Sequence, residues 1–300
     1  TFVGGNQDRD FAQIGHGGAP QFGDGSGQNE FIGDININTN LAGNDVILEG
    51  GDGFGNYALI GHGGAAMDNV VGATGNVTVN AANDILLTGG ERFQNGGVDL
   101  NLEPDVNFHT FAQIGHSMTP DNEGGAGRRT ASTSGDVTVT AVRDIMLQGG
   151  AGDASHAMIG NGANFGFNAS NPLSRRQFGD HTGDVTVVAG RDLSLIGGDA
   201  LQADALSNIA AGEVTDKPGA SASFAMIGNG GAGVESLAGG LTGSIDVRVG
   251  GDLFMESGTG QNAYAKIGHG DYLYSSPNSS GGGFREGDIS VAVGESATVN

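Results

Sequence analysis

The stretch GDVTVTAVRDIMLQGG at residues 135–150 decides the fold. Apolar residues alternate with polar ones in both of its halves, at Val137, Val139, Ala141, Ile145 and Leu147. A period of two is typical of strands with one buried face, and each half is too short to form a helix. We therefore expect two short β-strands in this stretch.

This block occurs six times along the chain, at residues 33–51, 75–90, 135–150, 183–198, 243–258 and 287–300. A second block, typified by FAQIGHGG, also occurs six times, at residues 11–18, 57–64, 111–118, 156–163, 224–231 and 264–271. It contributes a third strand to each repeat, with Ala112 and Ile114 on one face and Phe111 and Gln113 on the other. The alternating blocks predict one repeating structural unit.

Three short strands separated by Gly and Asp or Asn describe one coil of a β-solenoid. The sequence thus predicts an all-β parallel β-helix with about three strands per coil and about six coils that carry loop insertions. Successive coils would stack about 4.8 Å apart, which places equivalent residues in ladders. We expect residues 1–300 to form one continuous solenoid region and to be a piece of a longer chain.

The repeats differ in length only in two connectors, which contain Gly, Asn, Ser and most of the prolines. We interpret them as surface loops inserted at two corners of a constant scaffold. The candidate binding loops are 119–134, 164–182, 199–223 and 271–286. Their aromatic residues are candidates for contact with glycans or with a neighbouring chain: Phe165, Phe167, Tyr272 and Tyr274.

The composition excludes several function classes. There are 34 Asp and Glu against 12 Lys and Arg, a net charge of −22, which disfavours binding to nucleic acid or to an anionic membrane. Without cysteine, the chain has neither disulfides nor thiolate metal sites. No run of about 18 apolar residues predicts membrane insertion within this segment.

The second block carries a histidine in four of its copies, at a predicted corner. These histidines suggest a catalytic or metal-binding site, because they would line up along one edge of the solenoid. Two copies of the block carry Asn instead, and His and Asn both tolerate a left-handed backbone and form local hydrogen bonds. We favour a structural turn ladder over a metal site or catalysis. Its members are His16, His62, His116, Asn161, Asn229 and His269.

Two acidic rows follow the same repeat. One consists of Asp45, Asp84, Asp144, Asp192 and Asp252, with Glu295 in the last position. The other consists of Asp34, Asn76, Asp136, Asp184, Ser244 and Asp288. Side chains of this kind cap the backbone at corners, and we favour that role. Calcium binding by the first row is the alternative, since stacked carboxylates repel unless they are solvated or bridged; we expect no other cofactor.

Parallel β-helices also include polysaccharide hydrolases, and Gly-His-Gly occurs among polygalacturonase signatures. The Asn-Thr-Asp, Asp-Asp and Arg-Ile-Lys strings of that family do not occur here. Acids that repeat in every coil indicate structure, whereas a glycosidase site needs two carboxylates in one cleft. A secreted polysaccharide-active enzyme is therefore the third interpretation, and we expect no catalytic residues.

The blocks GDVTVTAVRDIMLQGG and AQIGHGG resemble the repeats of large filamentous-haemagglutinin-like bacterial exoproteins. The resemblance covers the whole chain and implies a right-handed parallel β-helix exported to the cell surface or the extracellular space. It implies a shaft whose loops contact other cells, surface glycans or surface proteins. The main rival is a self-assembling extracellular filament or sheath subunit, because open strand edges permit self-association.

Overall fold

The computed structural model describes residues 1–7, 10–18, 29–53, 55–64, 70–90, 110–118, 132–151, 155–162, 179–199, 223–231, 239–259, 263–270 and 284–300. These residues form an all-β structure in which strands pair in parallel. Within them, no helix long and apolar enough to cross a membrane is found. The predicted all-β, parallel architecture is confirmed.

The strands form four ladders and one short pair. Sheet A contains β1 (Phe2–Val3), β5 (Val46–Glu49), β10 (Ile85–Thr88), β15 (Ile145–Gln148), β19 (Leu193–Ile196), β23 (Leu253–Glu256) and β27 (Ala297–Val299). Sheet B contains β2 (Phe11–Ile14), β6 (Tyr57–Ile60), β11 (Phe111–Ile114), β16 (Ala157–Ile159), β20 (Ala225–Ile227) and β24 (Ala265–Ile267). The pair C consists of β7 (Gly63–Gly64) and β12 (Ser117–Met118).

Sheets D and E follow in each repeat. Sheet D contains β3 (Asn29–Ile32), β8 (Val70–Thr74), β13 (Ser132–Ser134), β17 (His181–Thr182), β21 (Leu241–Thr242) and β25 (Arg285–Glu286). Sheet E contains β4 (Ile35–Asn38), β9 (Val77–Ala81), β14 (Val137–Ala141), β18 (Val185–Ala189), β22 (Ile245–Val249) and β26 (Ile289–Val293).

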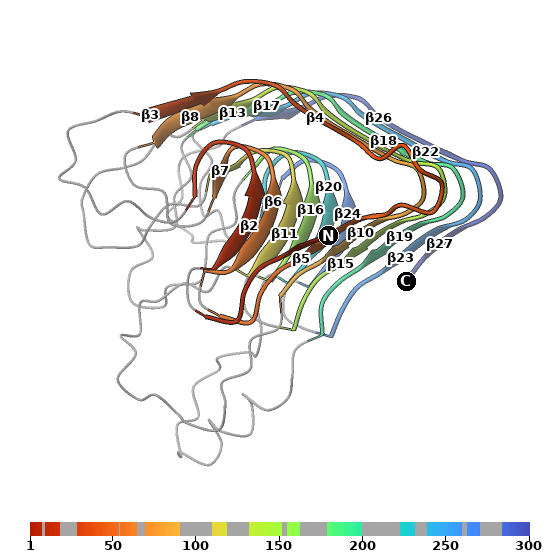
Figure 1. The fold of residues 1–300 in the computed structure, drawn as a ribbon. Helices are drawn as coiled ribbons and strands as arrows, with labels where there is room; N and C mark the ends of the chain where they lie inside the picture. Colours follow the sequence, from red (N-terminus) through yellow and green to blue (C-terminus); the bar gives the residue numbers. More distant parts are fainter. Residues whose placement is uncertain are drawn as a thin grey trace, which may run out of the picture.

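The chain visits sheets A, B, D and E in turn and then returns to A, so one passage makes one coil (Figure 1). Each strand pairs with its equivalent in the next coil; Val137 pairs with Val185, for example, and Ile145 with Leu193. The expectation of three strands per coil is wrong by one. Sheet D is the additional ladder, and its strands are as short as two residues.

The main core lies between sheets A, B and E. In the inner coils, the residues of these strands that face the core are buried, such as Val137 and Val139 in β14, Ile145 in β15 and Ile114 in β11. Equivalent apolar residues repeat in each coil and form one continuous cluster along the stack. Stacking therefore buries the apolar face that a single coil would leave open to solvent.

The opposite face of sheet B is buried as well in the inner coils, whereas Phe11 at its first strand is 41% exposed. Six rings stack along it at centroid distances of 4.8 to 5.1 Å. The rings belong to Phe11, Tyr57, Phe111, His156, Phe224 and Tyr264. Phe111 and Gln113 thus lie opposite Ala112 and Ile114, as predicted, but they are buried. Burial of its hydroxyl raises the pKa of Tyr57.

Glycine at the corners permits close stacking of the coils. Gly135 has a φ of 134°, and a Cβ on it would overlap the carbonyl oxygen of Gly75 in the preceding coil. Gly115 has a φ of 127°, and its Cβ would overlap the carbonyl oxygen of Gly160. L-residues rarely adopt such φ values, so both backbone shape and contact distance require glycine at these positions.

Most of each candidate binding loop lies outside the described residues. The described parts are 132–134, 179–182, 199, 223 and 284–286. The four aromatic candidates, Phe165, Phe167, Tyr272 and Tyr274, lie outside them too. The corner between sheets E and A is described in each coil, and the acidic row lies there.

Candidate functional site

The six His and Asn residues of the turn ladder lie in register at the corner after sheet B. In the first five members, the backbone N–H donates to the side chain of the equivalent residue in the next coil. The bonds run from His16 to His62 Nδ1, from His62 to His116 Nδ1, from His116 to Asn161 Oδ1, from Asn161 to Asn229 Oδ1 and from Asn229 to His269 Nδ1. Their lengths are 2.9 to 3.1 Å. This row is a continuous hydrogen-bonded ladder between coils.

In the five members from His62 to His269, the other end of the side chain bonds a glycine carbonyl oxygen at the start of sheet E in the preceding coil. His62 Nε2 lies 2.8 Å from the Gly33 carbonyl oxygen, and His116 Nε2 lies 2.8 Å from that of Gly75. Asn161 Nδ2 donates to the Gly135 carbonyl at 2.6 Å. Since Nδ1 accepts a hydrogen bond, each of these imidazoles is neutral and carries its proton on Nε2.

This geometry explains why His and Asn replace each other. Asn Oδ1 takes the acceptor role of His Nδ1, and Asn Nδ2 takes the donor role of His Nε2. Both ring nitrogens of His62 and His116 are used by backbone groups, and both side chains are buried. These imidazoles therefore have no nitrogen left for acid–base chemistry on a substrate.

Burial affects the protonation of this row. Desolvation lowers the pKa of His116 to about 4, against the opposing effect of its bond to the Gly75 carbonyl. Desolvation also lowers the pKa of His62 below its ordinary value. The two rings stack at a centroid distance of 4.9 Å, so a charge on one disfavours a charge on the other. Both imidazoles are neutral at pH 7.

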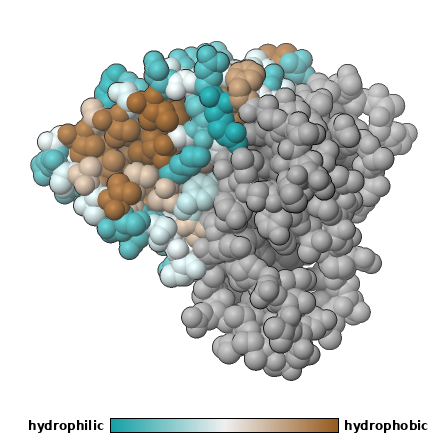
Figure 2. All heavy atoms as spheres, turned by 180° about the vertical axis from the view of Figure 1, so that it is seen from behind, coloured by the Kyte–Doolittle hydropathy of each residue, from teal (hydrophilic) through white to brown (hydrophobic). Residues whose placement is uncertain are grey.

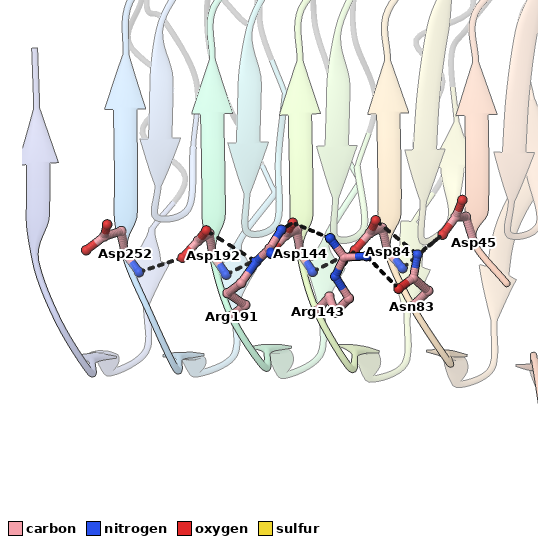
Figure 3. A network of polar contacts seen from close by, with 8 residues as sticks. All are labelled: Asp45, Asn83, Asp84, Arg143, Asp144, Arg191, Asp192 and Asp252. Atoms are coloured by element: carbon pink, nitrogen blue, oxygen red, sulfur yellow. Dashed lines mark hydrogen bonds and ion pairs between the residues drawn. The ribbon is translucent and has the colours of Figure 1, made fainter. Parts of the chain in front are cut away.

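The acidic row at the corner between sheets E and A forms a second ladder, in the opposite direction (Figure 3). Here the backbone N–H of each residue donates to the carboxylate of the preceding coil. The donors are Asp84, Asp144, Asp192, Asp252 and Ser296, and the acceptors are Asp45, Asp84, Asp144, Asp192 and Asp252. The bonds measure 2.9 to 3.2 Å.

The last position of this row is Ser296 and not Glu295. Leu253 pairs with Ala297, which places Ser296 beside Asp252. The Ser296 hydroxyl and N–H both donate to the Asp252 carboxylate and lower its pKa. The sequence alone suggested Glu295 because it is the acidic residue nearest that position.

Two arginines lie along the acidic row (Figure 3). Arg191 donates from Nε and Nη2 to the Asp144 carboxylate of the preceding coil, which lowers the pKa of Asp144. Arg143 Nε lies 3.7 Å from Asp84 Oδ1, and its Nη1 donates to Asn83. Both guanidinium groups are about half exposed, so the pairs offset repulsion between stacked carboxylates and add little stability.

The second acidic row behaves in the same way at the junction of sheets D and E. Asn76 donates its N–H to Asp34, Asp136 to Asn76, Asp184 to Asp136, and Ser244 to Asp184. Each acceptor is a side-chain oxygen of the preceding coil. These side chains thus cap the backbone at corners, and the N–H group that each of them caps belongs to the neighbouring coil.

The calcium alternative finds no preassembled ligand cluster. Among the described residues, no three or more His, Asp or Glu side chains are grouped to hold a metal ion. In the acidic row, each of the five candidate carboxylates already accepts a backbone N–H. A cation would therefore compete with the hydrogen bonds that join the coils.

Some polar residues with structural roles were not singled out from the sequence. Gln113 Nε2 donates to the carbonyl oxygens of His116 and Gly160, and so supports the His corner from the outer face of sheet B. Thr133 Oγ1 lies 2.6 Å from His181 Nδ1 in sheet D, and burial lowers the pKa of His181 to about 4. His181 was not singled out from the sequence because it lies in β17, a strand of two residues that the sequence did not predict.

Comparison with protein-family models, with curated proteins and with solved structures gives no match.

Proposed function

We propose that this chain is part of a non-enzymatic, rigid scaffold on a bacterial surface or in the extracellular space. In this proposal the coils form a right-handed parallel β-helix, about six in number, within the filamentous-haemagglutinin-like class. Right-handed crossover between parallel strands is the rule in other proteins, which supports that hand. The loops at the two variable corners would contact other cells, surface glycans or surface proteins.

The observation that carries the proposal is that the polar side chains of the described corners serve the connection between coils. His116, Asn161, Asp84 and Asp144 each bond backbone groups of a neighbouring coil. The same arrangement recurs in successive coils, whereas a catalytic site is expected once. A repeated shaft with variable loops favours multivalent binding, in which weak contacts add through effective concentration.

The proposal is tested by coating beads with the 300-residue chain and measuring their attachment to cells and to immobilised glycans. In a matched variant, residues 200–222 are replaced by residues 260–262 of the last repeat, which connect the same two sheets. We expect the wild type to attach and the variant to lose attachment while keeping its thermal midpoint. Attachment that survives the exchange of all four candidate loops, or no attachment by the wild type, would contradict the proposal.

The enzymatic alternative has its own test. The buried histidines of the corner motif are engaged by backbone groups, and we expect no cleavage of polygalacturonate or other acidic and neutral polysaccharides. Reducing-end release above that of heat-denatured protein would contradict this expectation.

A further inference from the structure

Two members of the turn ladder are asparagines that are followed directly by glycine. The pairs are Asn161–Gly162 and Asn229–Gly230, whereas the histidine members of the ladder have no amide at this position. Asparagine is a thermolabile residue, because its side-chain amide can be lost by deamidation. A following glycine favours the reaction, since without a Cβ it leaves its peptide nitrogen open to close approach. The sequence is therefore chemically labile at two corners of the stack.

The reaction consumes only the chain itself and water. The Gly162 nitrogen attacks Cγ of Asn161, so that the new N–C bond closes a succinimide ring and the Cγ–Nδ2 bond breaks. Nδ2 leaves as ammonia with the proton of the glycine nitrogen. Water then opens the ring at either carbonyl carbon, which leaves aspartate or isoaspartate. The attack requires a free glycine N–H and an amide group that can turn toward it.

The folded corner denies both requirements at Asn161. The Gly162 N–H donates to the His116 carbonyl oxygen at 2.9 Å, so the attacking nitrogen is engaged. Asn161 Oδ1 accepts the N–H of His116 at 3.0 Å. Nδ2 donates to the Gly135 carbonyl at 2.6 Å and to the Thr182 carbonyl at 3.2 Å. The side chain is fully buried, so water does not reach Cγ.

Asn229 is held in the same way. The Gly230 N–H donates to the Asn161 carbonyl oxygen at 2.9 Å, and Asn229 Oδ1 accepts the Asn161 N–H at 3.0 Å. Nδ2 donates to the carbonyls of Gly183 and Thr242 at 2.7 and 3.0 Å. This side chain is fully buried too. The bonds that join the coils therefore also protect both amides.

Burial inside the stack depends on the neighbouring coil. Ile289 and Val291 in β26 are 53% and 42% exposed, and Figure 2 shows apolar side chains open to solvent on the face that carries β26. Their equivalents one coil earlier, Ile245 and Val247, are covered by β26 and are buried. Separation of two coils would likewise bring solvent to the residues between them and break the bonds that hold the amides.

A deamidated corner could not close again. Aspartate at position 161 would turn an acceptor oxygen, in place of Nδ2, toward the carbonyls of Gly135 and Thr182. A buried charge that faces acceptors is strongly disfavoured. Isoaspartate would lengthen the main chain by a carbon atom just before Gly162, which forms a bridge with Ser117 of the preceding coil. Neither product fits the folded stack.

We propose that Asn161 and Asn229 are deamidation sites that the folded corner protects and that opening of the stack exposes. Opening is then recorded in the covalent structure, because a deamidated chain cannot rebuild the ladder. Unfolding becomes irreversible with the time that the chain spends open, which sets a kinetic limit on stability. The inference concerns the ladder alone and does not rest on the proposed function or on its loops.

The test is timed ageing of the 300-residue chain at neutral pH, in buffer and in urea, followed by peptide mass mapping. In urea we expect Asn161 and Asn229 to deamidate as fast as Asn95, which lies outside the described residues and also precedes a glycine. In buffer we expect both sites to react at least about 100-fold more slowly than in urea, because the open state is rarely populated. Dilution from urea should recover less folded protein in step with the amide loss at these two sites.

The matched control is the double variant Asn161→His and Asn229→His, which places the residue of the other copies at both corners. Histidine supplies an acceptor and a donor to the same backbone groups, as His116 does, and cannot deamidate. We expect this variant to refold as fully after ageing in urea as before, although Asn95 deamidates. Should the variant not fold, aged wild-type chains separated by charge into intact and deamidated fractions give the same comparison.

Two results would overturn the proposal. One is deamidation of Asn161 or Asn229 at similar rates in buffer and in urea, which would show that the corner gives no protection. The other is full refolding of chains that carry the deamidated sites, which would show that the ladder tolerates the product. Neither result bears on attachment to cells, so the proposed function is tested separately.

Discussion

The backbone N–H of His62 donates a hydrogen bond to Nδ1 of His116, 54 residues later in the chain, at 3.1 Å. Nε2 of the same ring bonds the Gly75 carbonyl oxygen at 2.8 Å. Gly75 and His62 both belong to the preceding coil, so one buried side chain joins its own coil to the preceding coil at two points. His116 therefore contributes two hydrogen bonds between coils.

Replacement of His116 by Ala should be costly, and replacement by Asn should not. His116→Ala leaves the His62 N–H and the Gly75 carbonyl without partners, and buried groups of this kind cost about 1 to 3 kcal/mol each. His116→Asn retains both bonds, as Asn161 does. Urea unfolding of the two variants measures the difference. Equal losses would show that the ring acts through packing alone.

Stability should fall as the pH drops below 6.5. The folded pKa of His116 is lowered to about 4, so between these values the unfolded state binds more protons and acid favours unfolding. For His116 alone the loss between about pH 7.5 and about pH 5 is about 2 kcal/mol, and it levels off near the folded pKa. Denaturant midpoints across this range measure it.

The control for the pH effect is His116→Asn, which cannot titrate. We expect this variant to lose less stability on acidification than the wild type does. The carboxylates Asp144 and Asp252 have lowered pKa values, so their contribution is lost only below their ordinary range, at a more acidic pH. Parallel pH profiles for wild type and variant would contradict the assignment.

The sequence predicted much of this arrangement because its signals are local. Alternation in Val137 and Val139 reports which side chains face the core, and the exchange of His for Asn reports a shared hydrogen-bonding pattern. The sequence could not show which backbone group each side chain bonds, because the partner belongs to another coil. For Asp144 that partner is the N–H of Asp192.

Sheet D was missed for a different reason. His181 and Thr182 form a strand of two residues, too short to display any period. The strand forms because Thr133 and Leu241 lie on either side of His181 in the stack, which is tertiary information. The Glu295 assignment failed similarly, since only the pairing of Leu253 with Ala297 fixes the register.

The Asp144 carboxylate accepts the Asp192 N–H and pairs with Arg191, and substitution should separate the contributions of these two interactions to stability. Asp144→Asn keeps an oxygen for the Asp192 N–H and loses the ion pair with half-exposed Arg191, which is worth less than about 1 kcal/mol. Asp144→Ala also loses the cap and should cost about 1 kcal/mol more. Chemical denaturation compares them. If Asn and Ala are equally destabilising, the charge and not the cap is what matters.

Calcium should have little effect on stability. The carboxylates of Asp84, Asp144 and Asp192 already accept backbone N–H groups, and a ligand stabilises only when it binds the folded state better. We expect the same thermal midpoint with millimolar Ca²⁺ as with chelator, and magnesium is the control. A rise specific to calcium that Asp144→Asn abolishes would restore the cation-ladder hypothesis.

The most direct test of the stacked-coil account is a disulfide between neighbouring coils, since the chain has no cysteine of its own. Thr138 pairs with Thr186 in sheet E, and Thr186 pairs with Asp246 one coil further on. Neighbouring strands lie about 4.8 Å apart, within the Cα separation of about 4.4 to 6.8 Å that a disulfide needs, whereas two coils span about 9.6 Å. Mild oxidation should cross-link Thr138→Cys with Thr186→Cys rapidly and leave Thr138→Cys with Asp246→Cys reduced. Equal cross-linking of both pairs, or of neither, would contradict the register on which the account rests.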